Sequence, residues 1–334
     1  MKKNINIFIA RTPLQLFNCI EARDRFHKDE QNILFYQYRS VIDKKQIENL
    51  IDSSWYEVVE YPLTLSNRLF FPISLSKIVS KYKSKVSSCY YGAYNGIISH
   101  LINSLNPTHK YLVDDGIKTI KISQFIKDNK LDKRGFLRPI KDWLLNSTRE
   151  YIYQSKFFTV YDEIENHLPH RVVKNDYRAF KKRVSTMKRE DIVYFIGTAL
   201  LKRSIKTEEI FEQELERVIE YYQERNQKFI YILHRYEDIE YMNSLAKKYS
   251  FEAVRFDNII EVELLRRGVV PSGVSSFAST AVETIDMIYG VEVKIFELDN
   301  SGIFEKYQKV FQDLYNNFRE KGVDVIDSTN SQSN

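Results

Sequence analysis

The chain has 334 residues, of which 43% are hydrophobic and 28% charged, a balance typical of a soluble globular protein with room for two domains. Lysine and arginine number 50 against 45 aspartate and glutamate. The resulting net charge of +5 falls well short of the basic stripe expected of a nucleic-acid-binding protein. A modest positive excess suits an anionic small substrate, and it leaves open a loose contact with an anionic membrane face.

The cysteines and the N-terminus indicate a reduced, non-membrane environment. Cys19 and Cys89 lie in apolar or aromatic surroundings and form no CxxC or Cys/His cluster, so we expect buried thiols and neither a zinc site nor a disulfide framework. Arg11 ends the first apolar run, which is too short for a signal sequence, and no stretch approaches the roughly 18 apolar residues of a membrane span. These features predict a cytoplasmic protein.

The first half alternates β-rich runs with helical periods, a pattern that predicts βαβ units and a parallel sheet. Pro13 suits the first turn of a helix, where its missing N–H costs nothing. The predicted strands are 5–10, 32–38, 56–61, 88–91 and 110–113, and the predicted helices are 13–27, 43–51, 75–83 and 93–105.

Residues 117–190 are less regular. Arg134–Tyr151 is a basic amphipathic stretch, and Val172–Arg189 is strongly basic and is expected to lead into a linker. The apolar side of the first stretch comprises Phe136, Leu137, Ile140, Trp143, Leu144 and Leu145.

Regular alternation resumes near residue 192 and continues to 326. The predicted strands are 192–196, 229–233, 251–254, 268–271 and 291–296, and the predicted helices are 208–225, 238–247, 259–266, 279–288 and 303–321. The polar tail after Asp327 is expected to be disordered. We therefore predict an α/β protein with two Rossmann-like domains, 1–175 and 190–326. Their parallel sheets would face a central cleft, with ligands at the carboxyl ends of the strands.

The first candidate for chemistry is Asp114-Asp115-Gly116, directly after the strand 110–113. A carboxylate pair there would point toward the cleft, and Gly116 allows a sharp turn. Adjacent carboxylates repel, which can raise one pKa and give a usable general base. Aspartate is also a favoured helix N-cap, so a purely structural turn stays an alternative.

The second candidate is His234, at the end of the strand 229–233. A histidine there could donate a proton to a leaving phosphate or bind the phosphate as a cation, and Arg235 beside it could be a further phosphate partner. The alternative is a histidine with a structural role only.

The third candidate is Gly273-Val274-Ser275-Ser276, expected to lie just before a helix. Hydroxyls and unpaired N–H groups at a helix N-terminus form an anion site, suited to a nucleotide phosphate. Gly197-Thr198, after the strand 192–196, could approach the same phosphate. Serine is also a preferred N-cap residue without any ligand. The sequence holds no GxxxxGK[ST] and no GxGxxG.

The order of these features resembles the bacterial sialyltransferases of glycosyltransferase family 52, the lipooligosaccharide and capsule sialyltransferases. The matching motifs are a strand followed by Thr12-Pro13-Leu14-Gln15, then Asp114-Asp115-Gly116, His234 and Ser275-Ser276. The likeness runs from about residue 8 to 280. The family's histidine is usually followed by proline, whereas Arg235 and Tyr236 follow His234 here.

The resemblance implies a GT-B fold and an inverting, single-displacement transfer of sialic acid from CMP-sialic acid to a glycan acceptor, without a metal or other cofactor. The acceptor would belong to a bacterial surface polysaccharide or lipooligosaccharide. Asp115, ahead of Asp114, would deprotonate the acceptor hydroxyl, and His234 would protonate or hydrogen-bond the leaving phosphate. The implied donor-binding residues are Thr12, Gln15, Gly197, Thr198, Arg235, Ser275 and Ser276. No nucleic-acid partner is implied, and a homodimer is consistent with the resemblance. Peripheral contact with the inner membrane face is left open by the positive charge.

Two alternatives stay open. A GT-B enzyme could instead transfer a neutral sugar such as glucose from a UDP donor. The chain could also be a non-catalytic basic module that binds a membrane or a polyanion through Arg134–Tyr151 and four lysines, Lys77, Lys81, Lys83 and Lys85. A solvated helix face explains the same charges.

Overall fold

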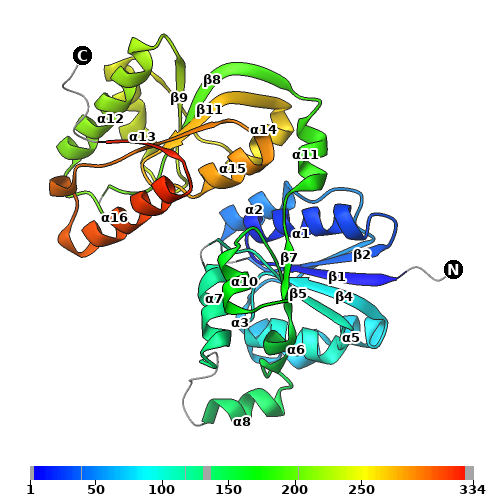
Figure 1. Ribbon diagram of the computed structural model, residues 1–334. Coiled ribbons are helices and arrows are strands. Elements are labelled where there is room, and N and C mark those ends of the chain that lie inside the picture. The colour runs from blue at the N-terminus through cyan, green and yellow to red at the C-terminus, as the bar shows by residue number, and fades with distance from the viewer. Residues whose placement is uncertain (1–3, 39, 117, 131–136, 202, 328–334) are drawn as a thin grey trace. The chain divides into compact units, whose positions relative to one another are not determined.

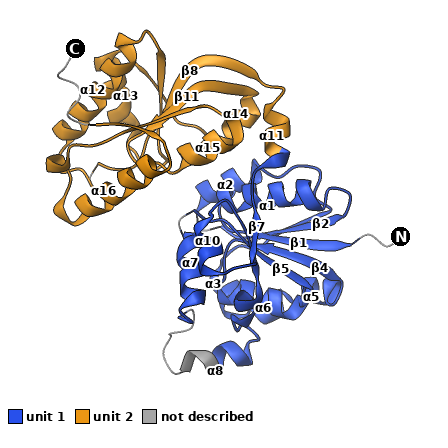
Figure 2. Ribbon diagram, in the orientation of Figure 1, with its two compact units in different colours: residues 1–179 blue, residues 180–334 orange. Residues whose placement is uncertain are grey.

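The computed structural model describes residues 4–38, 40–116, 118–130, 137–201 and 203–327. The chain divides into two compact units, residues 1–179 and 180–334 (Figure 2). Each unit is built on a parallel sheet with helices between successive strands (Figure 1). The predicted α/β class with two parallel sheets is confirmed.

The sheet of the first unit has seven strands in the order β3-β2-β1-β4-β5-β6-β7, and all neighbours are parallel. The strands are β1 (Ile5–Ala10), β2 (Gln31–Tyr36), β3 (Glu57–Glu60), β4 (Val86–Tyr91), β5 (His109–Val113), β6 (Lys156–Thr159) and β7 (Val172–Lys174). The strand order reverses between β1 and β4. In sheets of this kind ligands bind at such a point, beyond the carboxyl ends of the strands.

The helices of the first unit begin where the sequence supplies caps. The Thr12 hydroxyl accepts the N–H of Gln15 at 3.3 Å, and Pro13 occupies the first turn of α1. The helices are α1 (Pro13–Phe26), α2 (Val41–Glu48), α3 (Leu65–Leu69), α4 (Phe71–Ser74), α5 (Ser76–Tyr82), α6 (Gly96–Leu105), α7 (Lys118–Lys127), α8 (Leu137–Leu144), α9 (Glu150–Gln154) and α10 (Glu163–His167).

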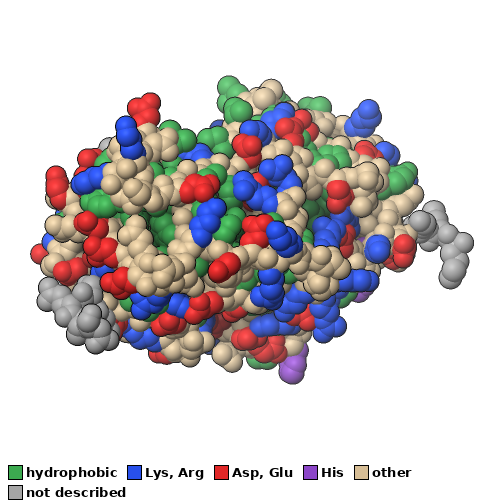
Figure 3. Space-filling view, turned by 90° about the horizontal axis from the view of Figure 1, so that it is seen from above, with side chains coloured by type: hydrophobic (Ala, Val, Ile, Leu, Met, Phe, Trp, Pro, Cys, Tyr) green, Lys and Arg blue, Asp and Glu red, His purple; other side chains and the backbone are tan. Residues whose placement is uncertain are grey.

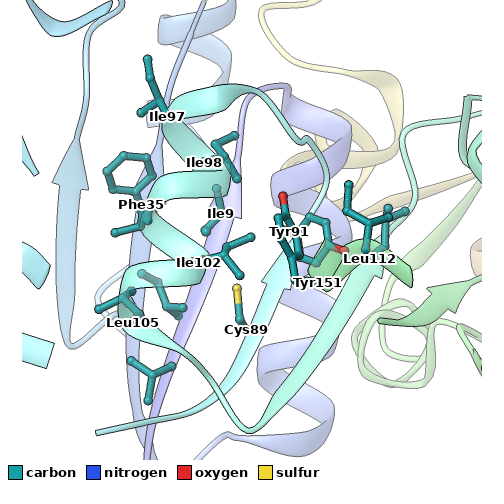
Figure 4. Close-up of a cluster of buried hydrophobic side chains, with 14 of the residues drawn as sticks. Ile9, Phe35, Cys89, Tyr91, Ile97, Ile98, Ile102, Leu105, Leu112 and Tyr151 are labelled. Atoms are coloured by element: carbon teal, nitrogen blue, oxygen red, sulfur yellow. The ribbon is translucent and has the colours of Figure 1, made fainter. Parts of the chain in front are cut away.

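The core of the first unit lies between the sheet and α6. Ile9 of β1 and Cys89 of β4 face Ile98 and Ile102 of α6 (Figure 4), and all four side chains are fully buried. Full burial of an aliphatic side chain contributes about 1.5–3 kcal/mol. Both cysteines are free and buried, and burial raises the pKa of each thiol, so the prediction of buried thiols is confirmed.

The sheet of the second unit has six strands in the order β10-β9-β8-β11-β12-β13, again with parallel neighbours. The strands are β8 (Lys188–Ile196), β9 (Lys228–Ile232), β10 (Glu252–Val254), β11 (Val269–Ser276), β12 (Glu292–Phe296) and β13 (Asp324–Ile326). The helices are α12 (Glu208–Glu224), α13 (Ile239–Tyr249), α14 (Ile260–Arg267), α15 (Ala281–Tyr289) and α16 (Glu305–Glu320), with a 3₁₀ turn at Asn300–Gly302. The core is aromatic: the ring of Phe195 contacts those of Tyr231, Phe277 and Phe296.

Two sequence predictions are corrected. The expected linker at 172–189 instead contains β7, α11 (Arg178–Val184) and the start of β8. This segment is ordered although it is rich in cations, because the side chain of Tyr177 is buried and its hydroxyl donates to Asn18 Oδ1 at 2.9 Å. The fourth strand of the second half runs to Ser276 rather than ending at Pro271. A register shift between Pro271 and Gly273 in the pairing with β8 accommodates the proline.

The basic amphipathic stretch 134–151 contributes α8 and α9, while its first residues, 134–136, and the tail beyond Asp327 lie outside the described residues. On the face seen in Figure 3, acidic and basic side chains are interspersed over most of the surface. None of the helices in the described part of the chain is long and apolar enough to cross a bilayer.

Candidate active site

In the first unit, a candidate site lies at the carboxyl edge of β1, β4 and β5. The register pairs Ile9 with Tyr91 and Tyr91 with Leu112, so the loops after these strands leave the sheet together. The Thr12 hydroxyl lies 3.4 Å from Oδ1 of Asp115. The structure therefore brings together the predicted motifs around Thr12 and Asp115, which are 103 positions apart in the chain.

Asp115 is the carboxylate of the acidic pair that reaches solvent. Its side chain is 16% exposed, and Oδ2 forms an ion pair with Lys118 Nζ at 3.0 Å. Its backbone N–H donates to the hydroxyl of Thr119 at 2.8 Å, which fixes the turn. Gly116 follows with φ +66°, a left-handed conformation that favours glycine. An acceptor hydroxyl could meet Asp115 from the solvent side.

Asp114 has a different environment, because its carboxylate is buried. Oδ1 accepts the hydroxyl of Thr159 at 2.7 Å, and Oδ2 accepts the N–H of Val160 at 2.8 Å. Burial raises the pKa of Asp114 to about 7, and the two hydrogen bonds oppose that rise. We had expected repulsion between the paired carboxylates to raise a pKa, but burial is the leading cause. Asp114 thus connects β5 to the end of β6, and it holds Asp115 in place.

Gln15, predicted to bind the donor, is buried and serves the turn between β1 and α1. Its side-chain carbonyl accepts the N–H of Arg11 at 2.8 Å. Gly92, after β4, packs against it so closely that a Cβ there would lie 2.3 Å from Cγ of Gln15. Gln15 is therefore a support for Thr12 rather than a group that reaches a ligand.

In the second unit, a candidate site lies at the carboxyl edge of β9, β8 and β11. The register pairs Ile232 with Ile196 and Ile196 with Ser276. Gly197 directly follows Ile196, His234 comes two positions after Ile232, and Ser276 is itself the third strand end. Three motifs that are far apart in the sequence therefore meet at one edge of the second sheet.

His234 is half-buried on the loop after β9. Its Nδ1 accepts the N–H of Tyr236 at 3.3 Å, which leaves the proton of the neutral ring on Nε2. Burial lowers the pKa of His234, and Arg235, Arg203 and Arg255 lower it further. The unliganded ring is therefore a neutral hydrogen-bond donor near pH 7. A bound anion would oppose the effect of the arginines.

Glu237 fixes this loop, and the sequence analysis missed it. Oε2 accepts the backbone N–H of His234 at 2.6 Å, and Oε1 accepts the hydroxyl of Tyr231 at 2.7 Å. Burial raises the pKa of Glu237 to about 7. A Cβ on Gly197 would lie 2.4 Å from Oε2, so the carboxylate needs a glycine there. An acidic residue three positions after a strand-end histidine was the only signal in the sequence.

Cations and an unpaired hydroxyl complete this edge. The guanidinium groups of Arg203 and Arg235 lie 5.2 and 4.9 Å from the ring centre of Tyr236, and Arg255 donates to the backbone carbonyl of Glu237. All three arginines are exposed. The Thr198 hydroxyl is buried without a hydrogen-bond partner among the described residues. Guanidinium and hydroxyl groups in this arrangement suit a phosphate.

The serine pair does not lie at a helix N-terminus, contrary to our expectation, because β11 continues through Ser276 and α15 begins only at Ala281. The Ser276 hydroxyl donates to the carbonyl of Ile196 at 2.8 Å and accepts the N–H groups of Ala278 and Ser279. Ser275 is buried in the core near Tyr222. Ser276 thus joins β11 to the end of β8, and the Ser275 hydroxyl does not reach the edge.

No protein-family model and no curated protein sequence matches this chain. Solved structures do share its fold. A Listeria monocytogenes protein assigned as a UDP-N-acetylglucosamine 2-epimerase matches with a TM-score of 0.53 and 10% identity, over 88% of this chain and 79% of that one. A Polygonum tinctorium UDP-glucosyltransferase capable of glucosylating indoxyl matches with a TM-score of 0.52 and 12% identity, over 89% and 80%.

A third match is Phytolacca americana UGT2 in complex with UDP-2-fluoro-glucose and pterostilbene, with a TM-score of 0.51 and 10% identity over 98% of this chain and 86% of that one. Identities this low relate the chains by fold alone. The chain has the two-domain, parallel-sheet GT-B fold, and its resemblance to family 52 stays a prediction.

Proposed function

We propose that the chain is an inverting glycosyltransferase that uses a nucleotide sugar as donor, with Asp115 as general base and the edge around His234 as the site of the nucleotide phosphate. The observation that carries the proposal is this second edge. It combines a neutral imidazole donor, three exposed arginines and the buried Thr198 hydroxyl at the strand ends of a GT-B unit. Such groups match a phosphate and have no comparable role in the core.

The proposed reaction is a single displacement. The Asp115 carboxylate takes the proton of the acceptor hydroxyl, and the acceptor oxygen forms a bond to the anomeric carbon. The bond from that carbon to the donor phosphate oxygen breaks, and its electron pair leaves with the nucleotide. Nε2–H of His234 donates to a phosphate oxygen, and the arginines offset the charge that develops there.

CMP-sialic acid is the proposed donor. The order of the motifs supports this choice, and so does the phosphate chemistry. A monophosphate leaving group carries less charge than a diphosphate, so a histidine with guanidinium groups can neutralise it without a metal ion. The same reasoning predicts that activity persists in EDTA, and loss of activity there would contradict a metal-free mechanism.

A UDP-sugar is the second candidate donor. It is favoured by one specific finding, namely that a UDP-glucosyltransferase and a protein in complex with UDP-2-fluoro-glucose are among the structures with this fold. In that case the arginines would face a diphosphate, and the choice of base would remain Asp115.

Calorimetric titration with CMP and with UDP separates the two donors. The proposal predicts that CMP binds more tightly than UDP and that His234→Asn weakens the binding. Preference for UDP would move the donor to the second candidate. Failure of both nucleotides to bind would contradict the glycosyltransferase proposal itself.

A further inference from the structure

Short helices of the first unit carry bulky apolar side chains on their solvent side. In α3 and α4, Leu65, Leu69 and Ile73 lie at intervals of four residues, and all three are exposed. Leu65 is 73% exposed and Ile73 is 72% exposed. Phe70, between the two helices, is also exposed. The next apolar residues, Phe71 and Leu75, are buried in the core of the first unit. They attach this segment to the core, whereas Leu65, Leu69, Phe70 and Ile73 face solvent.

Helix α8 carries a second exposed set: Ile140, Trp143 and Leu144. The surfaces that carry the two sets are neighbours, because α4 and the residue that follows α8 both contact His100 of α6. The ring of His100 in α6 contacts Phe71 of α4, with 5.3 Å between ring centres, and its Nδ1 lies 2.7 Å from the carbonyl oxygen of Leu145, directly after α8. We call the two sets together the apolar ridge; it comprises Leu65, Leu69, Phe70, Ile73, Ile140, Trp143 and Leu144.

The segment that carries the first part of the apolar ridge is basic. Between Glu60 and Asp114 the sequence contains no aspartate or glutamate. It contains six basic residues there: Arg68, Lys77, Lys81, Lys83, Lys85 and Lys110. Arg68, Lys77, Lys83 and Lys85 are all exposed. The acidic residue of α8, Asp142, lies beside Ser147, whose hydroxyl donates to its Oδ1 at 3.3 Å.

We infer that the apolar ridge docks the first unit on an anionic lipid surface. Apolar side chains enter the boundary between headgroups and acyl chains, tryptophan prefers the headgroup level, and lysines meet the anionic phosphates. The apolar ridge supplies the apolar side chains and the tryptophan, and the basic segment that carries its first part supplies the lysines. Large apolar side chains that project singly from short helices among cations suit a fluid bilayer better than the fitted pocket of a protein partner.

Tryptophan fluorescence tests this docking directly. The chain has two tryptophans: Trp55 is 7% exposed and Trp143 is 73% exposed. Addition of phosphatidylcholine vesicles that contain about 30 mol% phosphatidylglycerol should shift the emission to the blue as Trp143 leaves water. Pure phosphatidylcholine vesicles should give little shift, and Trp143→Phe should abolish it.

Vesicle cosedimentation with matched variants supplies the second test. Leu69→Ser with Ile73→Ser should weaken binding more than about tenfold, because two inserted side chains are lost. Lys77→Glu with Lys83→Glu should weaken it at least about fivefold for each cation removed. Val310→Ser is the matched control: Val310 is 60% exposed on α16 of the second unit, and its loss should leave binding unchanged. Circular dichroism shows whether each variant is folded.

Two results would overturn the inference. One is a wild-type chain that binds neither vesicle type, or that binds equally well after the ridge substitutions. The other is self-association in light scattering that the ridge substitutions abolish while vesicles have no effect, which would assign the surface to a second copy. These measurements use no donor or acceptor, so their outcome is independent of the proposed glycosyl transfer.

Discussion

At the carboxyl edges of the two sheets, an acidic side chain holds the loop in the same way, but the side chains that reach solvent differ. In each, a buried carboxylate with a pKa raised to about 7 holds a loop: Asp114 in the first unit and Glu237 in the second. Asp114 supports a partly buried carboxylate that still reaches solvent, Asp115, whereas Glu237 supports a histidine among arginines. The proposed function assigns the two edges different tasks, proton removal for the edge with Asp115 and phosphate binding for the edge with His234.

The largest expected effect is on the edge that holds Asp115, the proposed general base. Asp115→Ala should lower turnover by about 10²–10⁴, since it removes the general base, while the affinity for CMP should stay near that of the wild type. Steady-state kinetics and calorimetry measure the two quantities separately. Turnover near the wild-type rate would place the base elsewhere, and loss of CMP binding would break the division between the two edges.

Gly197→Ala should act instead on the edge around His234, the proposed phosphate site. The added Cβ would lie 2.4 Å from Oε2 of Glu237 and 2.7 Å from the Tyr231 ring, so the carboxylate that holds His234 must move. We expect CMP affinity to fall about 10–100-fold, as for a tight overpacking. Gly96→Ala is the control in the first unit, because its nearest contact would be Ser147 Oγ at 4.0 Å. Equal effects of the two substitutions would contradict this role of Gly197.

The two buried carboxylates should make stability depend on pH. Folded Asp114 keeps its proton up to about pH 7, whereas the unfolded residue releases it near pH 4. Raising the pH through this window therefore favours the unfolded state, by at most about 1.4 kcal/mol per pH unit for each group. The contribution of Asp114 and Glu237 to the free energy of unfolding should thus be larger at pH 5 than at pH 8.

Urea denaturation of Asp114→Asn and Glu237→Gln tests this pH dependence. Both amides can replace the hydrogen bonds of the acids they replace, since Thr159 and Tyr231 carry hydroxyls that can accept as well as donate. Each variant should lose part of the decrease in stability between pH 5 and pH 8. If both retain the full wild-type decrease, the two carboxylates do not share this property.

The smallest expected effect is a fractional proton uptake when a nucleotide binds. The arginines lower the pKa of His234 in the free chain, and a phosphate would raise it again. Calorimetry near pH 6.5 in buffers of different ionisation enthalpy should show protons taken up by the wild type and fewer by His234→Asn. Uptake that does not change in this variant would assign the proton to another group.

Much of the fold could be predicted because its signals are local. The alternation of apolar runs and helical periods located the central strands of both sheets, and Thr12-Pro13 marked the start of α1. The errors arose where tertiary context overrides a local signal. Pro271 looked like a strand end, yet a register shift in the pairing with β8 lets β11 continue. The basic residues of 172–189 looked like a linker, yet this segment forms the edge strand β7 and the helix α11.

The candidate site was predictable in its members and less so in their roles. Strand-end positions identified Asp115, Gly197 and His234, since the ends of parallel strands lie along one edge. Burial then separated Asp114 from Asp115, which look alike in sequence, and it showed that Ser275 and Ser276 are both buried. Glu237 could not be recognised in advance, because its role depends on its close packing against Gly197, which only the folded loop shows.

The most direct test of the central claim is a double-mutant cycle on acceptor-dependent turnover of CMP-sialic acid, with Asp115→Ala, His234→Asn and the two combined. If both edges serve one glycosyl-transfer reaction, each single variant should lose most of the turnover, and the double variant should lose less than the product of the two effects. Independent, multiplicative losses, or a wild-type chain that turns over no nucleotide sugar, would contradict the account.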